Sequence, residues 1–233
     1  MKKQILIVGS GFAGMWAAVS AARLSEQQGN DSLEIAVLAP LPELRVRPRF
    51  YEEKVSTLVA PLTDLFAELD ITFIAGHAEQ IDTTAKTVSY RMSGGAHATA
   101  SYDRLILATG SQTKRPPIAG LADYAFDIDQ LESAQVFERH LDSLALRPST
   151  PERNTVVVCG GGFTGIELAT ELPARLRARF GDNTEIKIVV VERGQSLAAA
   201  IATHCVKRLQ RRVRRWALNG GWRVKLKPLM LTA

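Results

Sequence analysis

The pattern of hydrophobic and polar residues at the start of the chain is that of a strand, a turn, a helix and a second strand. An apolar run at residues 4–8 leads into a cluster of glycines, and residues 15–23 then space their apolar side chains as a helix does. A second apolar run covers residues 34–38. This succession predicts a βαβ unit.

The same pattern returns in the second half of the chain. Residues 155–159 are apolar and β-branched, residues 160–165 are rich in glycine, and residues 166–179 have helical spacing before another apolar run at 185–191. Two βαβ units about 150 residues apart indicate two nucleotide-binding domains of the α/β class. We expect a first domain over residues 1–115, a connecting segment with a helix over 116–150, and a second domain over 151–233.

The segments between the two units give weaker signals. We expect short strands at residues 72–75, 87–91 and 98–102, and a buried strand at residues 104–108. An amphipathic helix is predicted over residues 132–146.

Charge is concentrated at the end of the chain. The net charge is +5, but residues 195–233 hold nine Lys and Arg and no Asp or Glu. These residues contain an apolar stripe at helical spacing, two glycines and an alternating strand at 222–227. This pattern favours a helix whose apolar stripe packs on the second domain and whose basic face is solvated. Docking of this basic tail on anionic lipid or nucleic acid is the alternative, and we do not expect a nucleic-acid partner.

Two cysteines, Cys159 and Cys205, are too far apart to indicate a zinc cluster or a redox pair. We expect Cys159 to lie in the core. A reducing cytoplasm is the simplest compartment, and the glycines that interrupt residues 4–22 argue against a signal peptide or a membrane span.

The first glycine cluster, Gly9-Ser10-Gly11-Phe12-Ala13-Gly14, is a G-x-G-x-x-G motif between a strand and a helix. Its glycines allow a tight turn, close approach of a pyrophosphate, and packing of the helix on the strand. The second strand should end in an acid that binds ribose, but the sequence there is Leu38-Ala39-Pro40. Backbone and water contacts then serve the ribose, or the affinity is reduced.

The second cluster, at residues 160–165, repeats this motif, and here the second strand does end in an acid, Glu192. A carboxylate at this position accepts hydrogen bonds from ribose hydroxyls and repels a 2′-phosphate, which favours NADH over NADPH. The neighbouring Arg193 keeps NADPH open as the alternative.

Four motifs together resemble the pyridine-nucleotide:flavin oxidoreductases, and within them the type II NADH dehydrogenases (NADH:quinone oxidoreductases). The motifs lie at residues 9–14, 47–52, 102–111 and 160–172. The resemblance implies two Rossmann-like domains, an FAD domain interrupted by an inserted NAD(P)H domain. It also implies an FAD-dependent oxidoreductase that passes hydride from NADH to the flavin and electrons to a quinone-like acceptor.

The resemblance also assigns cofactor-binding residues. Binding of the FAD pyrophosphate is assigned to Gly9, Gly11, Phe12, Ala13 and Gly14. Arg47 and Pro48 are assigned to the flavin ring, Ala78 to the adenine, and Thr109 and Gly110 to closure of the flavin site. Binding of NADH is assigned to Gly160, Gly162, Gly165 and Glu192. Glu167 is implied at the nicotinamide–flavin junction as a catalytic residue. It could equally be an acid that complements the helix dipole.

The sequence also departs from the family. Residues 44–55 contain no cysteine, which argues against dithiol chemistry. Chains of the family continue with a Gly-Asp motif that completes the FAD domain and with a C-terminal region for quinone and membrane attachment. Neither is found in these residues, so we expect a C-terminally truncated chain with an incomplete FAD domain, and a binding module without turnover stays open. Peripheral contact with the cytoplasmic membrane face and a homodimer also stay open.

Overall fold

The computed structural model describes residues 2–30, 32–192 and 227–228. They form an α/β protein, as predicted, with two compact units. The first unit comprises Met1–Val46 and Thr57–Pro116, and the second comprises Arg47–Ser56 and Pro117–Ala233. Residues 47–56 therefore pack with the second unit. The units are defined by packing, so the predicted assignment of cofactors to domains stays a prediction.

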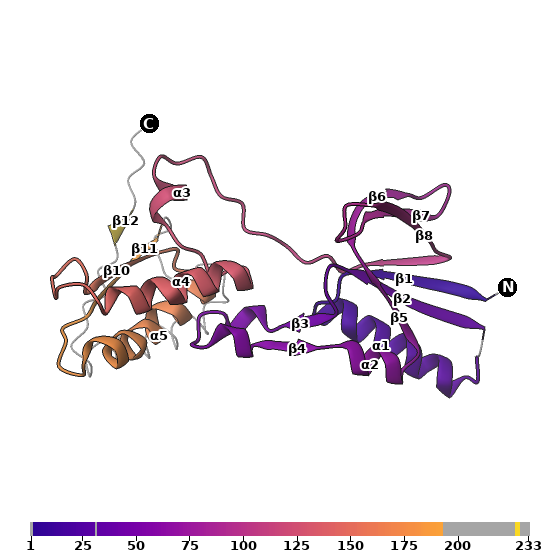
Figure 1. Cartoon of the computed structure of the whole chain (residues 1–233), viewed down its shortest axis with the longest axis horizontal. Coiled ribbons are helices and arrows are strands. Elements are labelled where there is room, and N and C mark those ends of the chain that lie inside the picture. The colour runs from indigo at the N-terminus through magenta and orange to yellow at the C-terminus, as the bar shows by residue number, and fades with distance from the viewer. Residues whose placement is uncertain (1, 31, 193–226, 229–233) are drawn as a thin grey trace. The chain divides into compact units, whose positions relative to one another are not determined.

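The first unit is built on a parallel sheet in the order β5-β2-β1-β9 (Figure 1). Helix α1 follows β1 and leads into β2, which gives the predicted βαβ unit. A short two-stranded ribbon, β3-β4, and a three-stranded antiparallel sheet, β6-β7-β8, complete the strands. The elements are β1 (Lys3–Val8), α1 (Phe12–Gln27), β2 (Leu33–Ala39), β3 (Glu43–Arg45), β4 (Val59–Pro61), α2 (Thr63–Glu68), β5 (Ile71–Ala75), β6 (His77–Asp82), β7 (Thr87–Arg91), β8 (His97–Ser101) and β9 (Arg104–Leu107).

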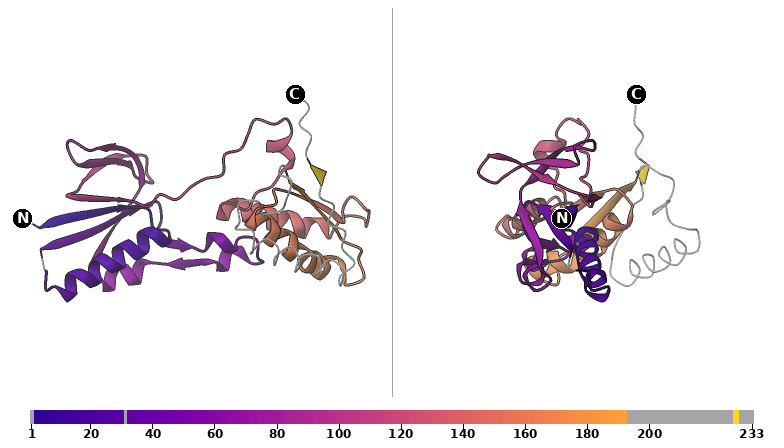
Figure 2. Two further views of the ribbon diagram at one scale, coloured as in Figure 1. Left: turned by 180° about the vertical axis from the view of Figure 1, so that it is seen from behind. Right: turned by 90° about the vertical axis from the view of Figure 1, so that its right-hand side faces the viewer.

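Both faces of this sheet are covered. Helices α1 and α2 lie on one face, where Ile7 of β1 packs with Met15 and Phe66. The antiparallel sheet lies on the other, where Val8 packs with Val88. The same layers are visible from behind (Figure 2). Side chains that alternate along β1 are therefore buried on both sides.

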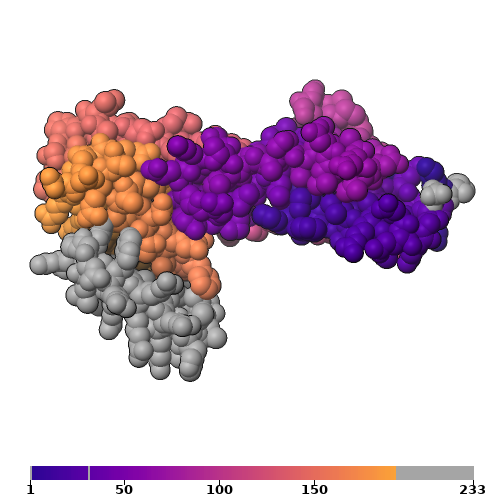
Figure 3. All heavy atoms as spheres, turned by 90° about the horizontal axis from the view of Figure 1, so that it is seen from below, coloured from indigo at the N-terminus to yellow at the C-terminus, as the bar shows by residue number. Residues whose placement is uncertain are grey.

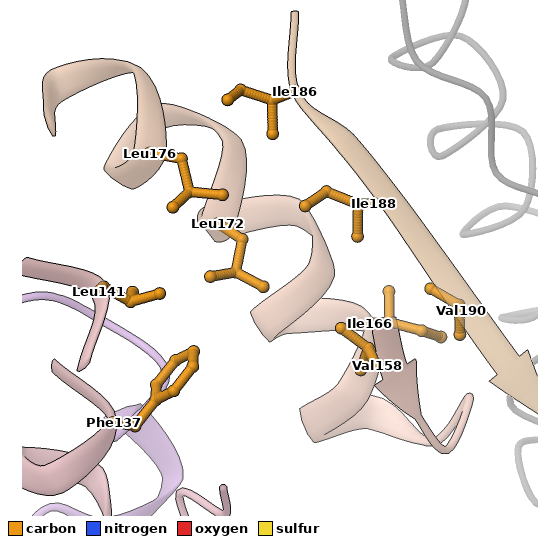
Figure 4. Packing of buried hydrophobic residues seen from close by; sticks show 9 residues of the cluster. All are labelled: Phe137, Leu141, Val158, Ile166, Leu172, Leu176, Ile186, Ile188 and Val190. Carbon is orange, nitrogen blue, oxygen red and sulfur yellow. The ribbon is translucent and has the colours of Figure 1, made fainter. Parts of the chain in front are cut away.

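The second unit has a parallel sheet in the order β10-β11-β12. Helices α4 and α5 pack on it, and their apolar side chains form one core with those of the strands (Figure 4). Residues 47–56 add two short 3-10 helices to this unit. The elements are η1 (Arg47–Arg49), η2 (Val55–Thr57, which ends one residue into the first unit), α3 (Leu121–Tyr124), α4 (Leu131–Leu144), β10 (Thr155–Cys159), α5 (Phe163–Phe180), β11 (Lys187–Glu192) and β12 (Lys227–Pro228).

Two expectations about burial were wrong. Strand β9 is not buried, because it lies at the edge of its sheet, and Leu107 is 60% exposed. Cys159 is exposed as well. Alternation along β10 turns Val158 into the core, and therefore Cys159 to the opposite face.

The predicted tail helix, Arg193 and Cys205 lie outside the described residues. Of the alternating strand predicted at 222–227, only Lys227 is described, in β12, where it pairs with Val191.

Candidate nucleotide-binding sites

The two glycine turns have nearly the same backbone geometry. Gly9 has a φ of 112° and Gly160 a φ of 115°, a region that L side chains rarely adopt. The Gly9 N–H donates to the carbonyl of Leu38 at 2.9 Å, and the Gly160 N–H donates to that of Val191 at 2.8 Å. Each turn is thus tied to the second strand of its own βαβ unit.

The third glycine of each motif brings the helix against the turn. A Cβ at Gly14 would lie 1.9 Å from the Gly9 carbonyl oxygen, and one at Gly165 would lie 2.0 Å from the Gly160 oxygen. A side chain at either position would force the helix away from the turn, as expected from the motif.

The middle glycine of each motif leaves room for a ligand. Gly11 and Gly162 are the N-cap residues of α1 and α5, and a Cβ at either would have no described atom within 4 Å beyond its chain neighbours. Among the described residues, no side chain forms a capping hydrogen bond at the start of either helix, and the first turn of each helix contains no acidic residue. Backbone N–H groups and the helix dipole at both sites therefore suit a phosphate.

The exposed surface of the first turn includes Phe12 and Ala13, which follow Gly11 in the motif. Thr109 and Gly110 come next to the same turn. The carbonyl oxygen of the preceding Ala108 would lie 2.2 Å from a Cβ at Gly9. The structure thus brings the first motif together with Thr109 and Gly110 inside one unit.

Ala78 lies in the same unit, exposed on β6 and paired with Tyr90. Its strand begins beside the end of β2, because the N–H of Gly76 donates to the carbonyl of Ala39 at 3.0 Å. Arg47 and Pro48 do not belong to this unit. They form η1 in the second unit, where the Arg47 guanidinium pairs with Asp129.

The ends of the second strands distinguish the two turns. The parallel registers pair Val8 with Leu38 and Cys159 with Val191, so Ala39 stands where the other unit has Glu192. A Glu192 carboxylate oxygen accepts a hydrogen bond from the Gly161 N–H at 2.5 Å. The acid predicted from the sequence is therefore fixed against the glycine turn.

The first turn is tied to its unit by a different side chain. The Ser10 hydroxyl lies 3.1 Å from the carbonyl oxygen of Leu41 and 3.1 Å from that of Glu43. Ser10 was not predicted as a site residue from the sequence. Its only sequence signal is a hydroxyl side chain at a variable position of the motif.

Glu167 is half-buried near the start of α5, and its charge acts on Tyr51 from the segment 47–56. Burial raises the pKa of Tyr51 above its ordinary value, and the negative charges of Glu167, Glu52 and Glu171 raise it further. The positive charge of Arg49 acts in the other direction and lowers this pKa. Tyr51 was not singled out from the sequence, although it lies inside the second of the four motifs.

Within the described ranges, no group of His, Cys, Asp and Glu could hold a metal ion. The described helices include none that is long and apolar enough to cross a membrane.

A family model and individual relatives agree on the family to which this chain is similar. The model of the pyridine nucleotide-disulphide oxidoreductase family matches residues 3–219. An NADH dehydrogenase-like protein of Mycobacterium tuberculosis is 36% identical over 193 residues, which are 81% of this chain and 47% of that protein. A demethylphylloquinone reductase of Synechocystis is 30% identical over 203 residues, 85% of this chain and 48% of that protein.

Solved structures show the same fold at lower sequence identity. NDH2 of Plasmodium falciparum in complex with NADH has a TM-score of 0.76 at 16% identity, covering 98% of this chain and 48% of that one. The sulfide:quinone oxidoreductase of Aquifex aeolicus has a TM-score of 0.72 at 22% identity, covering 97% of this chain and 51% of that one. The chain spans about half the length of the curated relatives it matches.

Proposed function

Because the chain belongs to the pyridine nucleotide-disulphide oxidoreductase family, we propose that it is an NADH-dependent flavoprotein oxidoreductase. NADH binds at the second glycine turn, FAD at the first, and a quinone-like molecule accepts the electrons. The observation that carries this proposal is the contact between Glu192 and the Gly161 N–H at 2.5 Å.

In this proposal the adenosine ribose of the dinucleotide lies beside the Glu192 carboxylate, which that contact fixes against the turn. The carboxylate accepts hydrogen bonds from the ribose hydroxyls, and its charge opposes a 2′-phosphate. Gly160 and Gly162 leave space among the described atoms for the pyrophosphate, and Gly165 lets the helix, which has no side-chain cap, pack against the turn. NADH is therefore favoured over NADPH at this turn.

The first turn fits FAD in its phosphate-binding part. Gly9, Gly11 and Gly14 repeat the geometry of the second turn, and Thr109 and Gly110 lie next to it. Ala39 supplies no carboxylate for the ribose, so this part of the site rests on backbone groups. When bound, FAD supplies a two-electron acceptor for the hydride of NADH.

The remaining assignments follow the family motifs. Arg47 and Pro48 contact the flavin ring, Ala78 contacts the adenine through its backbone, and Glu167 faces the nicotinamide–flavin junction. The names of the relatives, a demethylphylloquinone reductase and type II NADH:quinone oxidoreductases, support a quinone-like acceptor. Peripheral contact with the cytoplasmic membrane face is part of the same proposal.

The test is a titration of the purified chain with NADH and, separately, with FAD. Gly162→Val places a branched side chain where the pyrophosphate must approach, so NADH binding should be lost while FAD binding stays. Gly94→Val is the matched control, because a Cβ at Gly94 also meets no described atom within 4 Å and Gly94 lies in an exposed turn that belongs to neither motif. Normal NADH binding by Gly162→Val would show that residues 160–165 are a structural turn only.

A further inference from the structure

One side of α5 carries four charged residues at four-residue intervals, Glu167, Glu171, Arg175 and Arg179. Residues at this spacing lie on one face of a helix. The segment 47–56 runs along this face, and its purple atoms meet the orange atoms of the second unit in Figure 3. The segment therefore contacts the helix at several positions along its length.

The contacts follow the order of the charges. Arg179 Nη1 donates to a carboxylate oxygen of Glu53 at 2.7 Å, and Arg175 Nη1 donates to the carbonyl oxygen of Tyr51 at 2.7 Å. The charges of Glu171 and Glu167, one and two turns nearer the glycine turn, act on the Tyr51 phenol. The segment is thus laid along α5, with Tyr51 toward the second glycine turn.

Arg175 is unusual because it is a charged residue buried in an apolar core. It is 2% exposed, and its guanidinium lies 5.8 Å from the Phe137 ring in the apolar core. Its Nε has no hydrogen-bond partner among the described residues, and its distance to the Glu53 carboxylate is 4.0 Å. Burial lowers the pKa of Arg175, which shows the cost of desolvating the cation.

A buried cation with so few partners does not stabilise a core as well as an apolar side chain of similar volume. The specific gain from Arg175 is its hydrogen bond to the Tyr51 carbonyl, which joins residues 124 positions apart. The contacts at the two ends of the segment, Arg47 with Asp129 and the Lys54 N–H with Glu138, lie closer to solvent. Arg175 thus holds the middle of the segment from inside the core.

We propose that Arg175 is a positioning residue, which fastens the Tyr51 backbone to α5 and so holds the Tyr51 side chain on the side of this helix that carries Glu167, the residue assigned to the nicotinamide–flavin junction. The functional part of this inference rests on the proposed function, which places Glu167 at that junction. The structural part, the hold of Arg175 on residues 47–56, does not depend on it. The two parts can therefore fail separately.

The experiment compares Arg175→Met with Arg175→Lys in the full chain. Methionine fills the core but donates no hydrogen bond, so amide hydrogen exchange over residues 50–53 should accelerate about tenfold or more. Lysine keeps a cationic donor and should restore part of the protection. Arg177→Met is the matched control, because Arg177 lies on the same helix, two residues further and turned away from this face.

A second measurement follows the Tyr51 phenol by ultraviolet titration, assigned by difference from Tyr51→Phe. Release of the segment exposes the phenol and removes it from Glu167, so its pKa should fall toward the ordinary value in Arg175→Met. In NADH oxidation assays the same variant should lower kcat and leave KM for NADH unchanged, since the glycine turn is not altered.

Unchanged exchange and an unchanged Tyr51 titration in both Arg175 variants would overturn the proposal. If Arg175→Met does not fold, Arg175→Lys decides, because the loss of a planar donor should still weaken protection of residues 50–53. Failure of the proposed function would look different: the unmodified chain would not bind NADH, while the effect of Arg175 on the segment would persist.

Discussion

The two βαβ units have almost identical glycine turns in different surroundings. A Cβ at Gly9 would lie 2.2 Å from the Ala108 carbonyl oxygen, whereas a Cβ at Gly160 would meet no described atom within 4 Å. The reason is the position of the first strand: β1 is an inner strand with β9 beside it, whereas β10 is at the edge of its sheet among the described strands. Among the described residues, Gly9 is thus required by packing and by its φ, and Gly160 by its φ.

The same difference affects the residue before each turn. Val8 is 4% exposed, because the antiparallel sheet covers its face, but Cys159 at the equivalent register position is exposed. The ends of the second strands differ as well. The unit whose turn is better covered has Ala39 there, and the unit whose turn is less covered has the carboxylate of Glu192. The first turn is thus more closely packed, and the second turn carries a carboxylate that the first lacks.

The largest expected effect is the loss of unfolding free energy in Gly9→Ala, about 2–6 kcal/mol in total, which should exceed that in Gly160→Ala. Gly9→Ala and Gly160→Ala both strain the backbone, by about 1–3 kcal/mol each. Only Gly9→Ala also forces Ala108 to move, which should add about 1–3 kcal/mol to the loss of unfolding free energy. Urea unfolding, with hydrogen exchange to separate the units, measures both losses, and equal losses would contradict the difference between the turns.

The next effect concerns the residues before the turns. Val8→Ser removes buried apolar surface and buries a hydroxyl, so it should lower the unfolding free energy of the first unit by about 2–4 kcal/mol. Cys159→Ser is the counterpart at the equivalent, exposed position and should change stability by less than about 0.5 kcal/mol. A large loss in Cys159→Ser would show that the outer face of β10 is covered in solution.

A smaller effect is expected on nucleotide choice. Glu192→Ala makes the second turn resemble the first, and the loss of a charge-assisted hydrogen bond of about 1.5–3 kcal/mol should weaken NADH binding roughly tenfold or more. Removal of the charge should also narrow the preference for NADH over NADPH. Calorimetric titration with both nucleotides measures this, and Glu185→Ala, at an exposed acid before the same strand, is the control. Equal binding of both nucleotides by the unmodified chain would refute the role of Glu192.

The periodic parts of the fold could be predicted from the sequence. Strands β7 and β10 coincide with their predicted ranges, because residues that favour strands are concentrated there: Thr, Val and Tyr in β7, and an unbroken run of Thr and Val in β10. Helices α1 and α5 begin three residues earlier than predicted, at Phe12 and Phe163. Their N-cap residue is glycine, which lacks the side-chain signal that marks a helix start.

Contacts over long sequence distances could not be predicted in this way. The acid Glu192 was identified from its place after a strand, but its bond to Gly161 depends on the three-dimensional turn. The contact between Arg175 and Tyr51 joins segments that have no common periodicity, and β3 and β6 are too short or too polar to give a clear strand pattern. Local patterns therefore predicted the strongly periodic elements and the glycine turns, and tertiary packing determined what surrounds them.

The smallest expected effect tests how the first turn is held without a carboxylate. The Ser10 hydroxyl shares its hydrogen between the carbonyls of Leu41 and Glu43, so Ser10→Ala should cost about 0.5–1.5 kcal/mol of unfolding free energy. Ser20→Ala, at an exposed position in α1, should leave stability unchanged or slightly raised, because alanine favours a helix. Thermal unfolding of the two variants side by side gives the difference. If they are equally stable, the Ser10 bond contributes nothing, and the first turn is held by its backbone bond to Leu38 and by the packing of Gly14 alone.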